Sequence, residues 1–433
     1  RTGRSRPRQP AKIIVVDHLS SYVTTLCENI ERNLHILCTA EEREAIAVST
    51  VHKEALALVR KVHPRMFPAT EADVRECVET LRLRHAPEYD AGFVRGEWDN
   101  VVRLQGIGRW EEYRSAQRTG RGRGLGIKER RRLWQVFGGT LDNFEGRDLL
   151  DWSGLCQRGL ELLTDGSVRS PYTAVVVDEV QDLTPPELRF LKALCSVQPG
   201  NLLLCGDTGQ RIYPGGFSLR TLGIEVRGRA SVLRINYRTT EQIRRCADRI
   251  LGAVTDDMDG GDEQRAGTRS LLRGPEPRFA GHPTREDEIT AAVATVRAWV
   301  ADGLAPEAVG IFARTNKRLD DLCEAFDKTG VSWHRLSDRD AAGEGKVHLG
   351  TMHRAKGLEF KAVLVLGCGD AEVPSRAALR SADDPQDREA AEARERRLLY
   401  VAITRARDEV AVFWTGTPSR FLDPLIGTKE TGA

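Results

Sequence analysis

The sequence lacks the features that mark membrane, secreted and metal-stabilised proteins. Its 433 residues contain no apolar run near the roughly 18 residues that a membrane-spanning helix needs, so we expect no membrane partner. The basic N-terminus has no apolar core of a signal peptide. Nine cysteines, an odd number, occur without any CxxC pair. This pattern argues against structural zinc and a disulfide framework, and it favours a cytoplasmic location.

An excess of charge of one sign is also missing. The 65 Lys and Arg and 63 Asp and Glu residues leave a net charge of +2, so a surface for nucleic acid must be local. Residues 118–132, RTGRGRGLGIKERRR, concentrate positive charge, and Arg121 and Arg123 could pair with phosphates there. A solvated surface loop is the alternative. The charged run 383–397 is expected to be a solvated helix face. The tryptophans of the middle segment are expected in the hydrophobic core: Trp98, Trp110, Trp134 and Trp152.

Strand-like and helix-like patterns alternate along the chain. Residues 12–16 and 45–51 are predicted strands, each followed by the apolar spacing of a helix, which implies a parallel sheet. Residues 173–177, TAVVV, form another apolar strand, and Asp178 and Glu179 follow at its carboxyl end, where α/β sheets bind ligands. Two carboxylates there could hold Mg²⁺ and activate water. Acids that cap the following helix are the alternative.

Polar residues follow the next predicted strands in the same way. The segment GDTGQRIY comes after a strand at residues 201–205, so Gln210 could sense a γ-phosphate and Tyr213 could stack on a base. Residues 231–235 lead into NYRTT at the opening of a helix. There Arg238 could neutralise a transferring phosphoryl group, and Tyr237 could lie against an adenine.

In this order, DEVQD (178–182), GDTGQRIY (206–213) and LRINYRTT (233–240) resemble motifs II, III and IV of the UvrD/Rep-like superfamily 1 DNA helicases. GTMHRAKGLEF (350–360) is similar to motif V, and RLLYVAITRA (397–406) is similar to motif VI. VGIFARTN (309–316) resembles a segment early in the second motor domain of that family. Residues 13–20 and 49–52 resemble motifs Ia and Ib with lower specificity.

The resemblance implies an α/β fold with two RecA-like domains of the P-loop-NTPase type, each with a parallel sheet, and ATP between them. The first domain would comprise residues 1–62 and 166–250. A mostly helical insertion would comprise residues 63–165, and the second domain residues 251–433. Only about thirty residues separate VGIFARTN from motif V, which leaves no room for the large inserted 2B subdomain of UvrD and Rep. Translocation on a single strand is therefore a safer expectation than processive unwinding.

The resemblance also assigns roles to single residues. Asp178 would hold Mg²⁺, Glu179 would activate water, and Gln210 would couple the γ-phosphate to DNA. Arg238 and Arg405 would reach the γ-phosphate, where charge on the phosphoryl oxygens must be stabilised. The residues implied to bind nucleotide are Tyr237 on the adenine, with Gly357 and Glu359, the latter on the ribose. The residues implied to contact DNA are Thr50, His52, Tyr213, Thr351 and His353, and charge adds Arg121 and Arg123.

No GxxxxGK[ST] motif occurs in the sequence, although ATP hydrolysis in this family depends on that phosphate-binding loop. The sequence opens at Arg1, not Met, so we expect the loop to lie upstream; its loss is the alternative. We therefore expect this chain by itself to hydrolyse ATP very poorly.

Two classes of function remain open from the sequence. The first is an ATP- and Mg²⁺-dependent motor, a 3′-to-5′ translocase or helicase on single-stranded or partly duplex DNA, acting as a monomer. The second is a catalytically incomplete module that binds nucleic acid or protein. RNA as the track is a third possibility, because stacking and phosphate contacts tolerate either sugar.

Overall fold

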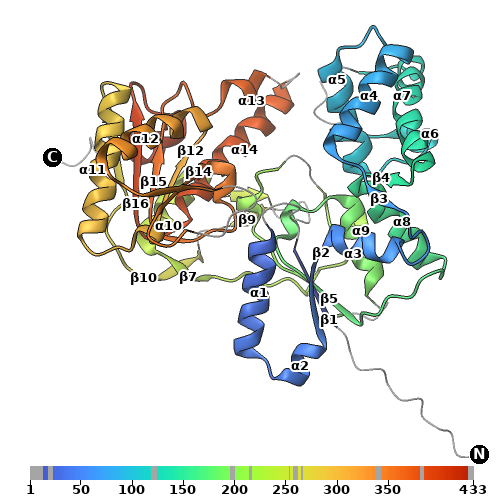
Figure 1. Ribbon diagram of the computed structural model, residues 1–433, viewed down its shortest axis with the longest axis horizontal. Coiled ribbons are helices and arrows are strands. Elements are labelled where there is room, and N and C mark those ends of the chain that lie inside the picture. Colours follow the sequence, from blue (N-terminus) through green and yellow to red (C-terminus); the bar gives the residue numbers. More distant parts are fainter. Residues whose placement is uncertain are drawn as a thin grey trace, which may run out of the picture. The chain divides into compact units, whose positions relative to one another are not determined.

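The computed structural model (Figure 1) describes residues 13–17, 23–118, 124–195, 200–213, 217–252, 254–256, 262–264, 267–336, 343–380 and 385–427. The chain divides into two compact units. Unit 1 comprises Arg1–Asp207 with Pro214–Ile224, and unit 2 comprises Thr208–Tyr213 with Glu225–Ala433. Parallel sheets and helices build both units, which confirms the predicted α/β class. Within the described ranges, no helix combines the length and apolar character that crossing a bilayer requires.

Unit 1 is built on a parallel sheet of four described strands in the order β2-β1-β5-β6. The strands are β1 Ile13–Asp17, β2 Ile46–Thr50, β5 Ala174–Val177 and β6 Leu202–Leu204. Val15 of β1 lies opposite Val48 on one side and Val176 on the other. β-Branched residues suit such a pleated, buried surface, because their side chains pack well against neighbouring strands. The predicted strands at residues 12–16, 45–51, 173–177 and 201–205 therefore lie within a residue or two of the observed ones.

Helices flank this sheet and connect its strands. They are α1 Val23–Leu37, α2 Ala40–Glu44, α3 Val51–Val59, α8 Trp152–Thr164, α9 Pro185–Leu194 and the short turns η2 Val180–Asp182 and η4 Arg220–Leu222. α8 and α9 approach closely at Gly159, where an added Cβ would lie 2.7 Å from the ring of Phe190. A glycine is therefore required at this crossing, because any side chain would push the helices apart.

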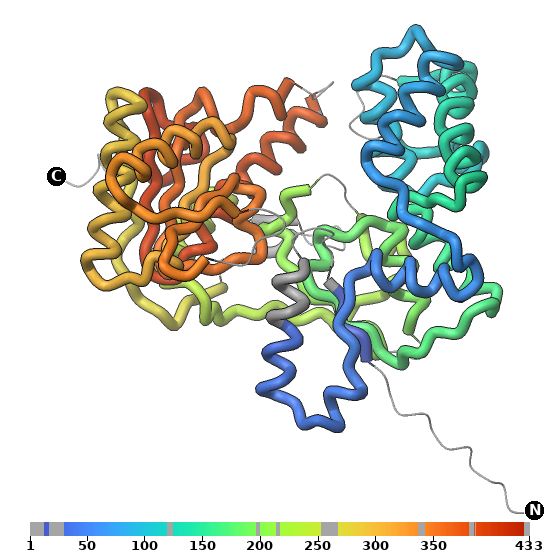
Figure 2. The backbone as a smooth tube through the Cα atoms, in the orientation of Figure 1, coloured from blue at the N-terminus to red at the C-terminus, as the bar shows by residue number. Residues whose placement is uncertain are grey.

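A helical insertion forms a separate layer of unit 1, in light blue to teal in Figure 2. Its elements are β3 Phe67–Pro68, α4 Glu71–His85, α5 Ala91–Glu97, the π-helical η1 Trp98–Arg103, α6 Trp110–Ser115, α7 Ile127–Gly146 and β4 Leu149–Leu150. Trp98 is fully buried in its core, as the sequence predicted, next to Phe137 and Tyr113. The insertion was predicted to extend to residue 165, but α8 packs against α3 and α9 instead.

Unit 2 contains a larger parallel sheet of six described strands in the order β11-β16-β15-β12-β14-β13. The strands are β11 Arg278–His282, β12 Val309–Ala313, β13 Trp333–Arg335, β14 Val347–Thr351, β15 Phe360–Leu366 and β16 Ala406–Thr415. All five residues of β12 are buried. Such continuous apolar strands are typical of parallel sheets that are covered on both faces.

Helices cover both faces of this sheet. Those described are α10 Glu241–Leu251, α11 Arg285–Ala301, α12 Asn316–Thr329, α13 Arg376–Arg380, α14 Pro385–Ile403 and α15 Asp423–Ile426, with the short turns η3 Thr208–Gln210, η6 Pro306–Ala308, η7 Met352–Ala355 and η8 Arg420–Leu422. α11 and α12 pack on one face, against residues such as Ile311 and Leu364. α10, α14 and η7 pack on the opposite face, against residues such as Phe312 and Val365.

The division of the chain differs from the expected domain boundaries. Residues 208–250 were assigned to the first domain, but residues 208–213 and 225–250 belong to unit 2. Apolar packing explains the difference, because Ile212 and Ile243 are buried in the same cluster as residues of β15 and α14. In addition, β7 Ile235–Thr240 pairs with β10 Arg269–Leu272 of unit 2, and a short ribbon joins β8 Val254–Asp256 to β9 Asp262–Gln264. The strand predicted at residues 231–235 thus begins only at Ile235.

Among the described residues of unit 2, buried ion pairs are formed by Glu288 and by Glu395. Arg318 of α12 pairs with Glu288 of α11, and Glu288 also accepts hydrogen bonds from the Gly367 amide (2.8 Å) and the Thr415 hydroxyl (2.5 Å). Glu395 of α14 pairs with Arg314 at the end of β12 (2.8 and 2.7 Å) and is 3% exposed. The expectation of a solvated face over residues 383–397 is therefore wrong at Glu395. A buried carboxylate is tolerated here because its hydrogen bonds replace those lost with water.

The titration of His348 should make unit 2 sensitive to acid. His348 is buried in β14, and burial lowers its pKa from 6.5; His334 adds to the lowering, and Glu307 opposes it. Below the ordinary pKa of histidine, the unfolded chain therefore binds a proton at His348 that the folded chain does not yet bind. The free energy of unfolding is therefore fully retained above that pH and falls as the pH drops below it.

We expect His348→Leu to reduce this loss of stability, as measured by urea unfolding at about pH 7.5 and about pH 5. Part of the loss should remain, because burial also lowers the pKa of His353. His35→Leu, at an exposed histidine of α1 in unit 1, is the matched control for the replacement of a histidine by leucine. Equal pH dependence in the parent and His348→Leu would contradict the prediction.

Candidate functional site

The acidic pair lies at the carboxyl edge of the unit 1 sheet, directly after β5. The Asp178 amide continues the ladder by donating to the Val16 carbonyl (3.0 Å), and the Glu179 amide donates to Asp178 Oδ1 (2.9 Å). Glu179 adopts a left-handed backbone conformation, with φ 51° and ψ 37°. Such a φ is uncommon for a residue with a Cβ, and it turns the chain sharply out of the strand.

Gln181 holds Glu179 of the acidic pair in place, and sequence reasoning assigned Gln181 no role. Its side chain is almost fully buried, and Nε2 donates a hydrogen bond to Glu179 Oε2. Its Oε1 accepts from the Asp207 amide at 3.1 Å, in the loop after β6. One amide thus connects the loops that follow two neighbouring strands. The signal in the sequence was a Gln two residues after an acidic pair, which local reasoning cannot place.

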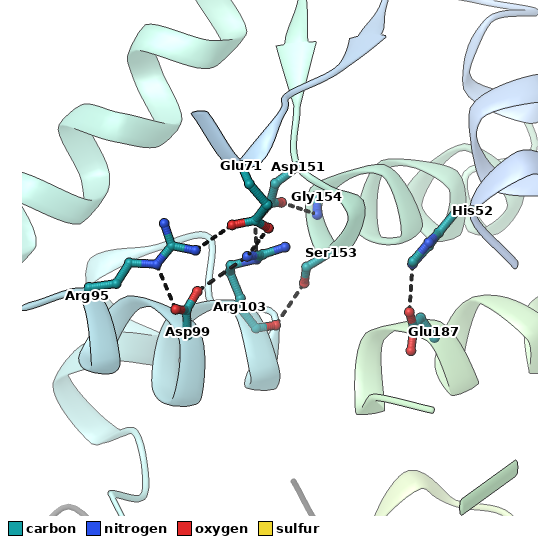
Figure 3. Close-up of polar contacts among 9 residues, drawn as sticks. All are labelled: His52, Glu71, Arg95, Asp99, Arg103, Asp151, Ser153, Gly154 and Glu187. Carbon is teal, nitrogen blue, oxygen red and sulfur yellow. Dashed lines mark hydrogen bonds and ion pairs between the residues drawn. The ribbon is translucent and has the colours of Figure 1, made fainter. Parts of the chain in front are cut away.

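Thr50 and His52 lie where β2 passes into α3. Thr50 is the N-cap of α3, and its hydroxyl accepts from the Lys53 amide at 3.2 Å. His52 Nε2 lies 2.7 Å from Glu187 Oε1 of α9 (Figure 3). The His52 ring stacks on Trp152 of α8 with 4.6 Å between centroids. Capping and packing thus account for the contacts of both side chains. Their contact with DNA stays a prediction.

Unit 2 brings together Gln210, Arg405 and Lys356. Arg405 is 2% exposed; its Nη2 donates to Gln210 Oε1 at 2.8 Å and its Nε donates to the Val401 carbonyl at 3.1 Å. Lys356, also buried, donates from Nζ to the Gln210 carbonyl at 3.1 Å. Two cations therefore meet at Gln210. The sequence assigned Gln210 and Arg405 separate roles at the γ-phosphate, and those roles stay predictions. Sequence reasoning did not single out Lys356.

The residues predicted to hold a nucleotide lie on the surface of unit 2. Tyr237 of β7 is 69% exposed. Arg238, the next residue, forms an exposed ion pair with Glu359. Gly357, two residues before Glu359, has φ +78°, a conformation that favours glycine. The structure thus brings Arg238 and Glu359 together, although the sequence assigned them to different ends of the nucleotide.

Motif V forms the end of β14 and the turn η7. Thr351 is the N-cap residue of η7, without a side-chain capping bond, and His353 lies within the turn. Burial lowers the pKa of His353, Arg314 lowers it further, and Glu395 opposes both. His353 is therefore held in the neutral form by its surroundings near neutral pH, and it would contact a nucleic acid through hydrogen bonds rather than charge.

The remaining predicted DNA contacts are Tyr213, Arg121 and Arg123. Tyr213 is partly buried and packs against the core cluster that contains Ile212. Arg121 and Arg123 lie outside the described residues. The basic helix that follows them is α7, where Arg130 donates to the Tyr113 carbonyl (2.8 Å) and Arg131 lies over the Trp110 ring. Arg130 and Arg131 therefore make their contacts with other residues of the helical insertion.

The donor set fits a magnesium nucleotide better than a metal held by protein alone. No group of three or more His, Cys, Asp or Glu that could hold a metal occurs among the described residues. Asp178 is exposed at the strand end. Mg²⁺ commonly takes one or two carboxylates and completes its shell with phosphate oxygens and water.

The bridge made by Gln181 should contribute to stability. We expect Gln181→Leu to lower the free energy of unfolding by about 1–3 kcal/mol, because it leaves the Asp207 amide without its acceptor. Denaturant unfolding followed by circular dichroism measures the change. Gln117→Leu, at an exposed glutamine, is the control and should change stability by less than about 0.5 kcal/mol. Equal stability of the two variants would show that the bridge contributes nothing.

Comparison with known proteins matches two family descriptions. Residues 9–216 match the UvrD/REP helicase N-terminal domain, and residues 332–417 match the UvrD-like helicase C-terminal domain. ATP-dependent DNA helicase UvrD2 of Mycobacterium tuberculosis is 27% identical over 374 residues, covering 60% of this chain and 52% of the relative. DNA helicase IV of Escherichia coli is 26% identical over 367 residues, covering 80% and 48%.

A shorter match of higher identity is the ATP-dependent DNA helicase PcrA of Staphylococcus aureus. It is 43% identical over 88 residues, which cover 20% of this chain and 11% of PcrA. The chain spans about half the length of the mycobacterial and E. coli relatives. Both family domains occur in the expected order, and the parallel sheets agree with the RecA-like domains of such proteins. The chain therefore belongs to the UvrD/Rep-like superfamily 1 helicases.

Proposed function

We propose that this protein is an ATP-dependent DNA translocase or helicase that moves 3′ to 5′ on single-stranded DNA. The observation that carries the proposal is the acidic pair Asp178–Glu179 at the carboxyl end of a buried parallel strand, with Glu179 held in place by Gln181. Relatives named as ATP-dependent DNA helicases also support this proposal. The protein would act in the cytoplasm and as a monomer.

Bound ATP with Mg²⁺ would supply a phosphoryl group that is transferred to water. Asp178 would hold the metal through a carboxylate oxygen. The Glu179 carboxylate would take a proton from the attacking water, and its left-handed backbone fixes where that carboxylate can point. These two roles belong to unit 1, where Gln181 and the strand end keep both carboxylates in one place.

Unit 2 would supply the positive charge that the transferring group requires. Arg405 is buried and already oriented by two hydrogen bonds, so its guanidinium needs little reordering to meet an anion. Arg238 would be the second cation, exchanging its surface partner Glu359 for phosphate oxygens. Gln210 touches Arg405 directly, so a change at one of them changes the other. This contact supports the predicted role of Gln210 in linking the nucleotide to DNA.

Binding to nucleic acid without catalysis is the second candidate function. The absence of GxxxxGK[ST] from the 433 residues favours it, because that loop supplies the main phosphate ligands. Assays on the chain as it stands separate the two functions. We expect binding of a fluorescent oligo-dT with very slow ATP hydrolysis. Rapid DNA-stimulated hydrolysis by the chain itself would exclude the non-catalytic module.

Glu179→Gln tests the proposed general base. In a form of the protein that carries a phosphate-binding loop, we expect DNA-stimulated ATP hydrolysis to fall by at least about 100-fold, since general-base catalysis typically contributes that much. ATP binding should persist, because the glutamine keeps the size of the side chain. Steady-state hydrolysis and equilibrium binding of a fluorescent ATP analogue measure the two properties. Turnover that survives the change would show that another group activates water.

The identity of the track is tested with matched oligonucleotides. We expect oligo-dT to stimulate hydrolysis in that form more strongly than oligo-U of the same length. Equal stimulation would make RNA an alternative track. A label at either end of the DNA then reports the direction of movement, and displacement from the 3′ end alone would contradict 3′-to-5′ movement.

A further inference from the structure

The helical insertion is fastened to the start of α8 by Arg103, the last residue of the π-helical segment η1 (Figure 3). Arg103 Nη1 lies 2.9 Å from Glu71 of α4 and 3.3 Å from Asp99, and its Nε lies 3.3 Å from Asp151 Oδ2. Arg95 tightens the same cluster through Asp99 (2.6 Å) and Glu71 (2.5 Å). One guanidinium therefore connects carboxylates of α4, η1 and the residue that begins α8.

Asp151 has two tasks, one for each carboxylate oxygen. Its Oδ1 accepts from the Gly154 amide at 2.8 Å and so caps α8, which leaves Oδ2 to face Arg103. Asp151 is 4% exposed; burial raises its pKa, and Arg103 is the strongest influence that opposes this. The Ser153 hydroxyl adds a second link by donating to the Arg103 carbonyl at 2.9 Å. The first residues of α8 are thus held from the side of the insertion.

The residue after Asp151 holds a candidate DNA contact. The Trp152 ring stacks on His52 with an interplanar angle of 14°. On its edge, His52 meets Glu187, whose other oxygen accepts from the Thr184 amide (2.6 Å) and hydroxyl (2.8 Å). The imidazole is therefore fixed in two directions, by a ring face from α8 and by a carboxylate from α9. A movement of the start of α8 would carry the Trp152 ring with it.

We propose that Asp151 and Trp152 are positioning residues that couple the seating of the helical insertion to the orientation of His52, and thereby to the affinity for single-stranded DNA. The inference rests on the proposed function, in which His52 contacts the strand. Asp151 cannot release Arg103 without leaving a buried charge unpaired, so the insertion and the start of α8 shift together. The Trp152–His52 stack then transmits the shift across a single ring contact.

A double-mutant cycle tests the coupling, because residues that act through one another have non-additive effects. The variants are Arg103→Gln, His52→Ala and the combination of both. Binding of a fluorescent oligo-dT to the whole chain is followed by anisotropy at a temperature where circular dichroism shows every variant folded. We expect Arg103→Gln to weaken binding about fivefold, or about 1 kcal/mol, in the parent and to have no effect once His52 is alanine.

Two further variants keep the test decisive if Arg103→Gln does not fold. Asp151→Asn keeps an oxygen for the helix cap but removes the charge that faces Arg103, and Trp152→Leu keeps an apolar side chain but removes the stacking face. Each should weaken binding only when His52 is present. Arg103→Lys should restore part of the affinity, because a cation again faces Asp151. Arg82→Gln is the matched control: it removes an arginine of α4 paired with Glu79 and remote from α8, and should leave affinity unchanged.

The outcomes separate this inference from the proposed function. If His52→Ala does not weaken binding, the predicted DNA contact at His52 is wrong and the coupling is overturned with it. If His52→Ala weakens binding but the losses add in the double variant, the coupling alone is overturned. If Arg82→Gln weakens DNA binding as much as Arg103→Gln, the coupling is also overturned. The loss of affinity would then follow from removing any positive charge from the insertion.

Discussion

Parallel pairing of buried strands is the constraint on which both units depend. In a parallel ladder the carboxyl ends of the strands arrive at one edge, and polar residues that follow them gather there whatever their separation in the sequence. Glu179 after β5 and Asp207 after β6 are connected in this way through Gln181. In unit 2, Arg314 ends β12 and Thr351 ends β14, and these two strands are neighbours. The apolar runs that form the strands therefore determine which polar residues meet at the carboxyl edge of each sheet.

Much of this arrangement was readable because strands and motifs are local signals. The β-branched run before Asp178 and the buried VGIFA strand are each fixed by a few consecutive residues, and the predicted bounds are close to those observed. The contact between Gln210 and Arg405 joins two residues that the sequence singled out separately, in two different motifs. Where a short segment carries the information, the sequence is sufficient.

The parts that were not predicted depend on contacts between distant segments. Gln181 and Lys356 stand inside recognised motifs, yet their partners, the Asp207 amide and the Gln210 carbonyl, are defined only by the folded backbone. Glu395 sits in a run of charges that looks solvated, and only the fold brings Arg314 to it from 81 positions away. The structure divides the chain at residues 208 and 225 rather than at the expected residue 250 for the same reason. Ile212 belongs to unit 2 because it packs into the core cluster of that unit.

At position 179 the left-handed backbone favours one type of residue, whereas the proposed reaction requires another. A residue with a Cβ at φ 51° costs roughly 1 kcal/mol or more compared with glycine, which adopts this region freely. Random mutagenesis followed by selection for heat resistance alone would thus favour glycine or asparagine at position 179. Selection for turnover would restore the acid. The two pressures can be satisfied together only by stabilising substitutions elsewhere, so improvement of this fold has to begin away from its acidic pair.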